Sequence, residues 1–382
     1  MDLRILLFGI LITIAGCKNP ETEIVKMSDK DWMMLDFDKV DSINPILKPA
    51  GSLFFECPLN EKIVKWEERN VLNPAAVVKN DSVYLFYRAQ DSMGTSRIGM
   101  AVSADGLHFK KRPAPVLFPA KDSMKKYEWN YRKGGETENS DSCYFCYFDG
   151  VEDPRIVQSE DGSYIMTYTA YDGKTARLAL ASSDDLINWT KHGLVLRDEK
   201  YKDTWSKSGA IVAERIGNKI IATRVNGKYW MYFGDTDLFM ASSEDLIHWQ
   251  VAENEENKKM IRVLNPRPGY FDSRLVEPGP YALLTDKGVL LIYNGSNAEN
   301  FNDPRLPEFT YAAGQALFDK DRPYQLVDRS KSFFIHPDKA YEKVGEVNEV
   351  CFVEGLVHFK DNWFLYYGTA DSKIAVAVRE DK

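Results

Sequence analysis

Ser182-Ser183-Asp184-Asp185-Leu186-Ile187-Asn188-Trp189 closes a strand-like run and belongs to a unit that recurs along the chain. The unit places a Ser-x-Asp turn before a hydrophobic-x-x-aromatic step that leads into the next segment. Similar units occur at 103–109 and at 242–249. Self-similarity of this kind, with several strands in each repeat, is typical of a β-propeller.

Strand-like runs occur in pairs along the chain. Each run is short, β-branched or aromatic, and bounded by Gly, Asp or Asn, as strands require. The pairs are 82–89 with 97–103, 164–170 with 176–183, 228–234 with 238–243, 289–295 with 310–317, and 363–368 with 373–378. One hairpin would fit any β-sandwich, but five pairs and a shared turn motif favour five blades. We therefore predict an all-β fold, a five-bladed β-propeller over residues 31–382.

The composition fits a large globular domain and argues against a nucleic-acid partner. The 382 residues are 44% hydrophobic and 28% charged, with a net charge of −8. Phosphate backbones require basic patches, which an acidic chain does not favour. Aromatic residues make up 13% of the chain, enough to fill a β-rich core or to provide platforms for sugars.

Residues 1–17 have the features of a lipoprotein signal peptide. The apolar run 5–14 is too short to span a bilayer but suits the core of a signal peptide. It ends in Ile14-Ala15-Gly16-Cys17, which resembles a bacterial lipobox and implies cleavage before Cys17 and acylation of its thiol. Residues 18–30 form a polar tether. We expect an exported lipoprotein held by lipid, periplasm-facing or at the cell surface, on the outer membrane. The alternative is a buried apolar helix with an incidental cysteine.

The remaining cysteines are Cys57, Cys143, Cys146 and Cys351. One Cys-x-x-Cys pair without a second pair or a nearby His-x-His spacing argues against structural zinc. We interpret these cysteines as small buried hydrophobes or as a non-catalytic disulfide. The sequence predicts no metal and no cofactor.

Gly150-Val151-Glu152-Asp153-Pro154-Arg155-Ile156 is the strongest candidate for chemistry. Pro154 restricts the conformation of Asp153, so the carboxylate is held in place. The simplest interpretation is an Asp-Pro turn with solvated neighbours. A ring of carboxylates with Arg and Asn, at equivalent places of several blades, would instead suit sugar hydroxyls and glycosidic acid–base chemistry. The preceding long loop, 122–149, would form part of the rim of that site.

From Asn73 to the C-terminus the chain resembles glycoside hydrolase family 130, the mannoside phosphorylases and β-mannosidases on five-bladed propellers. The resemblance rests on Asn73-Pro74-Ala75, Tyr87-Arg88-Ala89, the Ser-x-Asp-Gly turn, the repeated Ser-x-Asp-Leu-x-x-Trp, the Glu-Asp-Pro-Arg motif and Tyr366-Tyr367-Gly368-Thr369-Ala370-Asp371. It implies that Asp153 is the general acid and that the mannosyl subsite includes Asn73, Arg88 and Asp371. We add Asp105 and Arg155 to the expected substrate-binding residues.

The chain departs from the family at the phosphate site. Phosphorylases carry a His-Arg pair after Asn-Gly-Lys-Tyr, whereas 226–235 here contains none. A phosphate dianion needs paired cations, although Lys207 and Arg224 could remain. Where phosphorylases are glycine-rich, this chain has Glu277, which would repel phosphate but could activate water.

We therefore expect an exo-acting, inverting β-mannosidase, with β-1,2 linkages implied by the resemblance. Glu277 is the expected base, Glu214 the second candidate and Asp235 the third. Export points the same way, because a released sugar phosphate is useful only where it is retained. The alternatives are a phosphorylase whose phosphate site uses Lys207, Arg224 or Arg155, and a non-catalytic glycan-binding lipoprotein.

Overall fold

The computed structural model describes residues 31–134 and 147–381, and in this part of the chain the protein is almost entirely β-structure. The helices there are single turns, namely α1 (Lys125–Glu128), the 3₁₀ turn η1 (Tyr131–Gly134) and α2 (Ala340–Lys343). The predicted all-β class is confirmed. The proposed signal peptide, lipobox Cys17, the tether, and Cys143 and Cys146 lie outside the described residues.

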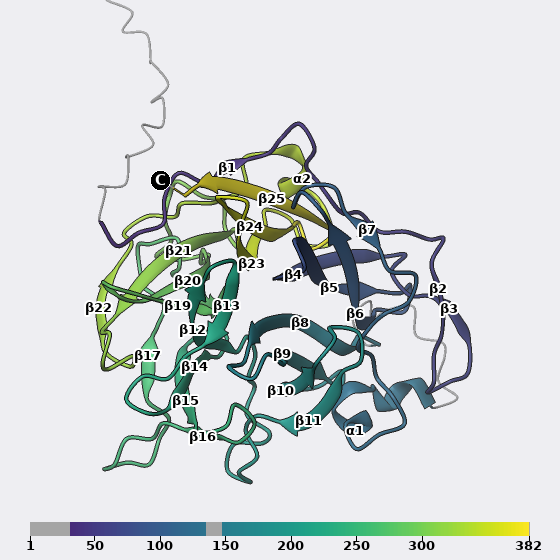
Figure 1. Ribbon diagram of the computed structural model, residues 1–382, viewed down its shortest axis with the longest axis horizontal. Coiled ribbons are helices and arrows are strands. Elements are labelled where there is room, and N and C mark those ends of the chain that lie inside the picture. The colour runs from purple at the N-terminus through teal and green to yellow at the C-terminus, as the bar shows by residue number, and fades with distance from the viewer. Residues whose placement is uncertain (1–30, 135–146, 382) are drawn as a thin grey trace, which may run out of the picture.

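The strands form consecutive antiparallel groups around a common centre (Figure 1). The first group contains β4 (Asn70–Lys79), β5 (Ser82–Gln90), β6 (Thr95–Ser103) and β7 (Lys110–Lys111). The second contains β8 (Asp149–Gln158), β9 (Tyr164–Tyr171), β10 (Ala176–Ser183) and β11 (Thr190–Leu194). The third contains β12 (Ala210–Ile216), β13 (Lys219–Ala222), β14 (Tyr229–Phe233), β15 (Leu238–Ser243), β16 (Trp249–Val251) and β17 (Arg262–Leu264).

The fourth group contains β18 (Leu275–Pro278), β19 (Ala282–Thr285), β20 (Gly288–Ser296), β21 (Tyr311–Phe318) and β22 (Leu326–Arg329). The last contains β23 (Cys351–Phe359), β24 (Asn362–Thr369) and β25 (Lys373–Glu380). Its outer strand is β1 (Asp38–Lys39), which pairs antiparallel with β25, so the N-terminal segment completes the sheet of the C-terminal strands. A separate hairpin joins β2 (Phe54–Glu56) and β3 (Ile63–Lys65).

All five predicted strand pairs are confirmed as antiparallel neighbours, with β5 on β6, β9 on β10, β14 on β15, β20 on β21 and β24 on β25. The strands β4, β8, β12 and β23, each near the start of its group, lie closest to the centre (Figure 1). The sequences of β4, β8 and β23 are almost wholly buried, as expected of strands covered on both faces.

The Ser-x-Asp repeat forms one turn three times. In the second group the Asp185 carboxylate accepts hydrogen bonds from the backbone N–H groups of Ile187 (2.8 Å) and Asn188 (2.7 Å), and the Ser183 hydroxyl accepts one from Leu186. Leu186 has a φ of 74°, and the equivalent residue in the first group is Gly106, with a φ of 78°. Glycine adopts this conformation freely, whereas Leu186 must offset its strain by complete burial.

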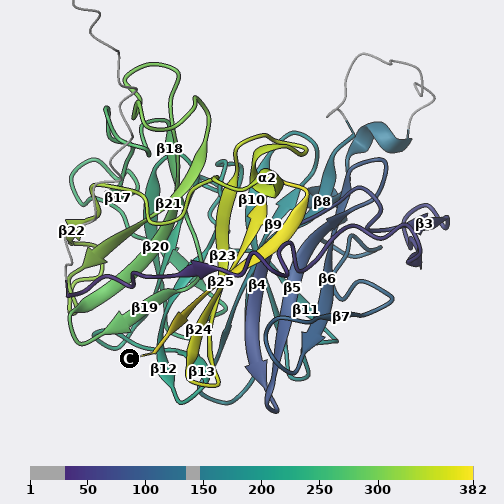
Figure 2. The same cartoon turned by 90° about the horizontal axis from the view of Figure 1, so that it is seen from above.

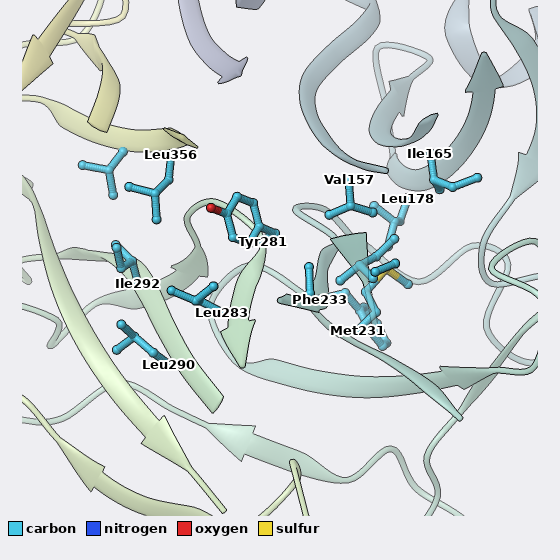
Figure 3. Close-up of a cluster of buried hydrophobic side chains, with 14 of the residues drawn as sticks. Val157, Ile165, Leu178, Met231, Phe233, Tyr281, Leu283, Leu290, Ile292 and Leu356 are labelled. Carbon is cyan, nitrogen blue, oxygen red and sulfur yellow. The ribbon is translucent and has the colours of Figure 1, made fainter. Parts of the chain in front are cut away.

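The apolar core lies between neighbouring groups. Side chains from several strands gather there, as Figure 3 shows for Val157, Ile165, Leu178, Met231, Phe233, Tyr281, Leu283, Leu290, Ile292 and Leu356. Figure 2 shows the same groups from above, with the inner strands running side by side. Cys57 and Cys351 are buried free thiols, which agrees with their interpretation as small buried hydrophobes. No helix of the described residues is long and apolar enough to cross a membrane.

Candidate active site

Irregularities in three inner strands place polar side chains at the same level of the centre. The register shifts between Leu72 and Pro74 in β4, between Glu152 and Arg155 in β8, and between Val353 and Gly355 in β23. The residues displaced from these ladders are Asn73, Asp153 with Pro154, and Glu354. A β-bulge re-aims a side chain and is common next to active sites. The backbone reflects this, since Asn73 and Asp153 have φ of 48° and 51°, values that Asn and Asp tolerate best.

Asp153 is held by groups from the first strand group. The Asn73 side-chain amide donates to Asp153 Oδ1 at 2.8 Å, and the Arg88 guanidinium lies 3.4 Å from the same oxygen. Asn73 Oδ1 is buried without a partner among the described residues. Burial raises the pKa of Asp153, but the charges of Arg88 and Lys207 outweigh it, so that pKa lies below its ordinary value. The carboxyl is therefore ionised in the free protein near neutral pH.

Arg88 also faces two carboxyl groups whose pKa values are raised, in contrast to that of Asp153. Its guanidinium lies 2.8 Å from Glu152 Oε1, which also accepts a hydrogen bond from the Ser96 hydroxyl at 3.0 Å. Burial raises the pKa of Glu152 despite Arg88, and the Asp153 charge adds to the rise. Burial raises the pKa of Asp371, in the turn between β24 and β25, to about 6. One guanidinium thus faces three carboxyl groups, and this cluster retains a proton under mildly acidic conditions.

The other side of the centre contains Lys207 and two carboxylates. Lys207 Nζ lies 3.3 Å from Asp235 Oδ2, and the Ser208 hydroxyl donates a short hydrogen bond to Glu277 Oε1. Burial would lower the pKa of Lys207, but the carboxylates Glu277, Asp235, Asp153 and Glu152 raise it, so the ammonium stays charged. Burial raises the pKa of Glu277 in spite of Lys207, which makes Glu277 a better base than an exposed glutamate.

Arg155 links the acid strand to the strand of Glu277. Its guanidinium donates to the carbonyl oxygens of Gly279 (2.7 Å) and Pro278 (2.7 Å), just after Glu277. It also donates to the carbonyl oxygen of Asp153 at 3.2 Å. These contacts give Arg155 a positioning role, and its substrate-binding role stays a prediction.

Glu354 was missed by the sequence reasoning. It lies 3.4 Å from Arg155, and neither of its carboxyl oxygens has a hydrogen-bond partner in the described part of the chain. Burial raises its pKa well above the ordinary value, so the neutral form is favoured. A partial signal was available, because Val353-Glu354 repeats the Val-Glu step of Val151-Glu152 and Val276-Glu277. The step does not give the exact position, since Glu152 and Glu277 are paired in their ladders whereas Glu354 is displaced, as Asp153 is.

Three predicted residues do not join this centre. Asp105 is the carboxylate of the first Ser-x-Asp turn, with its side chain half exposed and bonded to the N–H groups of Leu107 and His108. Glu214 lies on β12, six residues after Ser208 in the sequence, and accepts a hydrogen bond from the Thr223 hydroxyl at 3.3 Å. Arg224 donates to the carbonyl oxygens of Gly227 and Glu244 in an exposed turn. Among residues 31–134 and 147–381, no group of three or more His, Cys, Asp or Glu side chains is placed to hold a metal ion.

An all-β protein whose inner strands bring together buried carboxyl groups, an arginine and an asparagine has the chemistry of a carbohydrate-active enzyme. The model of a glycoside hydrolase 130 family, described as beta-1,4-mannooligosaccharide phosphorylase, matches residues 137–382. The chain belongs to glycoside hydrolase family 130.

Both phosphorylases and hydrolases occur among the similar proteins. A 1,2-beta-oligomannan phosphorylase from Thermoanaerobacter sp. (strain X514) is 31% identical over 83% of this chain and 92% of its own. The solved structure of a putative glycoside hydrolase from Bacteroides ovatus is 40% identical, with a TM-score of 0.85 over 92% of this chain and 98% of the other.

Another solved structure is 38% identical, with a TM-score of 0.86 over 93% and 96% of the two chains. It is described with the words "The GH130 family of mannoside phosphorylases contains glycoside hydrolases that target beta-1,2 mannosidic linkages in Candida mannan".

Proposed function

We propose that this protein is an exo-acting, inverting glycoside hydrolase that cleaves β-1,2-mannosidic linkages in manno-oligosaccharides. We further propose that the antiparallel groups around the centre are the blades of a five-bladed β-propeller. Successive antiparallel strand groups with polar residues on their inner strands support this architecture.

The surroundings of the candidate phosphate-binding cations support hydrolysis over phosphorolysis. A phosphate dianion needs paired, uncommitted cations. Of the three cations considered for a phosphate site, Arg224 lies in an exposed turn and Arg155 is bonded to backbone carbonyl groups. Lys207 remains, and it is already flanked by Asp235 and Glu277. A phosphate bound there would be repelled by these two carboxylates, whereas a water molecule would lie next to a base.

The roles follow from this arrangement. Asp153 protonates the leaving oxygen, and Glu277 deprotonates a water molecule on the opposite face of the sugar, with Asp235 beside Lys207 as the alternative base. An inverting enzyme needs about 6.5–9.5 Å between its two carboxyl groups to admit that water. Because Asp153 is ionised in the free protein, its proton must come from the cluster around Arg88 once substrate has excluded water, and it then passes to the leaving oxygen either directly or through a sugar hydroxyl. Asn73, Arg88 and Asp371 hold the terminal mannosyl unit.

The linkage and the cellular location are part of the same proposal. The relative from Thermoanaerobacter and the structure that mentions Candida mannan both carry β-1,2 linkages in their descriptions, which supports that linkage here. A lipid on Cys17 would hold the enzyme on the outer membrane, periplasm-facing or at the cell surface. Incorporation of labelled fatty acid that is lost in Cys17→Ala tests the anchor.

The deciding experiment incubates the purified protein with β-1,2-mannobiose, with and without phosphate, and quantifies mannose and mannose 1-phosphate. We expect mannose at a rate independent of phosphate, abolished by Glu277→Gln and retained by Glu214→Gln. Mannose 1-phosphate formed only with phosphate would overturn the hydrolase and identify a phosphorylase. Binding of mannobiose without any product would identify a glycan-binding protein.

A further inference from the structure

We infer that the exposed indole of Trp205 is a stacking platform for the mannosyl unit on the leaving side of the cleaved bond. This inference rests on the proposed action on manno-oligosaccharides, and it adds a subsite outside the charged centre. Trp205 lies in the segment between β11 and β12, two residues before Lys207.

The ring is exposed and yet fixed in orientation. Trp205 is 47% exposed, and its indole N–H donates to Asp235 Oδ2 at 3.0 Å. Tyr171, at the end of β9, meets the indole edge-on, with ring centroids 6.2 Å apart and an interplanar angle of 67°. A large ring held on two sides loses little further entropy when a ligand lies against it, which favours binding.

Contacts connect this ring to the charged centre. Asp235 Oδ2, which accepts the indole hydrogen bond, also lies 3.3 Å from Lys207 Nζ. On the other flank, Tyr171 lies close enough to Glu152 for that carboxylate to raise the tyrosine pKa, in addition to the effect of burial. The two rings therefore extend from the Glu152 side to the Asp235 side of the centre.

The difference in exposure between the charged centre and Trp205 indicates which sugar unit contacts the ring. The groups assigned to the terminal unit are enclosed, with the side chains of Asp153 and Arg88 only 4% and 15% exposed. An exo-acting enzyme places that unit deepest, so the units that follow must lie nearer to solvent. A pyranose has an apolar face of C–H groups and a rim of hydroxyls, and an aromatic ring next to carboxylates is complementary to both.

Binding measurements test the platform separately from the reaction. In an Asp153→Asn background, calorimetric titration with mannose and with β-1,2-mannobiose compares Trp205→Ala with Trp205→Phe. We expect Trp205→Ala to weaken mannobiose binding about tenfold and mannose binding by less than about twofold, with Trp205→Phe recovering most of the loss. Tyr324→Ala is the matched control, because Tyr324 is 43% exposed and also has an aromatic neighbour, Trp230, at 6.0 Å. It should change neither affinity.

Unchanged mannobiose binding in Trp205→Ala would overturn the inference. So would an equal loss for mannose, which would assign the ring to the terminal unit, or a failure of Trp205→Phe to rescue, which would assign the effect to the bond with Asp235. If wild-type protein releases no product but Trp205→Ala still weakens mannobiose selectively, the platform stands and the proposed reaction fails. If the background variant binds no mannobiose at all, the platform is rejected.

Discussion

Two sets of carboxylates occupy repeated positions in this molecule, one in the outer turns and one on the inner strands. The turn aspartates are satisfied by their own neighbourhood. Asp185 accepts two backbone N–H groups through Oδ1 and the Asn188 amide through Oδ2 at 2.7 Å, and its pKa is lowered by those hydrogen bonds. Asp105 and Asp245 repeat the pattern with His108 and His248 in place of Asn188.

The inner carboxyl groups are buried and depend on donors from other strands. Asp153 receives one amide N–H and a longer contact from Arg88, and Glu354 has no hydrogen-bond partner among the described residues. A carboxylate bonded by its own backbone shapes a turn, whereas one left short of donors in a buried centre retains capacity for a ligand or a proton. A carboxylate at a repeated position therefore has either a structural or a chemical role, depending on how many hydrogen-bond donors surround it.

The largest expected effect is on Asp153. Asp153→Asn keeps the size of the side chain and its contact with Asn73 but removes the acid, so we expect turnover of β-1,2-mannobiose to fall by about 10²–10⁴-fold or more. The melting temperature should change little, because an amide also relieves the repulsion with Glu152. Rates of mannose release and thermal unfolding of the same samples measure both quantities.

Asp105→Asn is the matched control from the outer set. It should leave mannose release within about twofold of wild type, because this residue only shapes a turn. Comparable losses in the two variants would contradict the division between inner and outer carboxylates.

Arg155 provides a second test, on stability. Arg155→Met removes the donor of the buried carbonyl oxygens of Asp153, Pro278 and Gly279, so we expect the free energy of unfolding to fall by about 3–5 kcal/mol. Arg224→Met is matched to it, since Arg224 also donates to two carbonyl oxygens but in an exposed turn. That variant should lose less than about 1 kcal/mol. Urea unfolding compares them, and equal losses would show that Arg155 does not support the centre.

The sequence predicted the fold class and the strand pairs well because short apolar runs and repeated turns are local signals. It also identified Asp153, Arg88 and Asn73, which the structure brings within hydrogen-bonding or ion-pairing distance. Asp105 and Arg155 were expected to bind substrate, but in the structure their side chains bond to the backbone of the protein. The sequence does not show which partners a side chain will contact. Arg155 lies two residues after the acid, yet its donors are taken by Pro278 and Gly279, more than 120 residues away.

Glu354 and Trp205 illustrate signals that depend on comparison between strand groups. Glu354 is recognised only when the inner strands are aligned at their register shifts, where it takes the place of Asn73 and Asp153. Trp205 stands in an irregular segment with no repeat, and its role follows from Asp235, which lies 30 residues further along the chain. Bulges and long-range contacts set these positions, and no local pattern encodes them.

A smaller effect is expected in the outer turns. Asp105→Ala removes the acceptor of two backbone N–H groups and should lower the free energy of unfolding by about 1 kcal/mol, as the loss of a helix cap does. The kcat and KM for mannobiose should stay unchanged. Urea unfolding and initial rates test this, and a loss of activity larger than the loss of folded protein would return Asp105 to the site.

The smallest expected effect is on the pH dependence of folding stability. The turn aspartates and the buried carboxyl groups should change that dependence in opposite directions. The pKa of Asp185 is lowered in the folded state, so its stabilisation is complete above its unfolded pKa of about 4 and is lost as pH falls further. Burial raises the pKa of Asp371 to about 6, so the folded state binds more protons between about pH 4 and 6 and becomes less stable as pH rises through that window.

Asp185→Asn should therefore flatten the loss of stability on acidification below about pH 4, while Asp371→Asn should remove a decline between about pH 4 and 6. Urea midpoints measured from pH 3 to 7 for wild type and both variants separate the two. Curves that change in the same direction would show that Asp371 is solvated like a turn aspartate, and the contrast between the buried centre and the outer turns would then not extend to this residue.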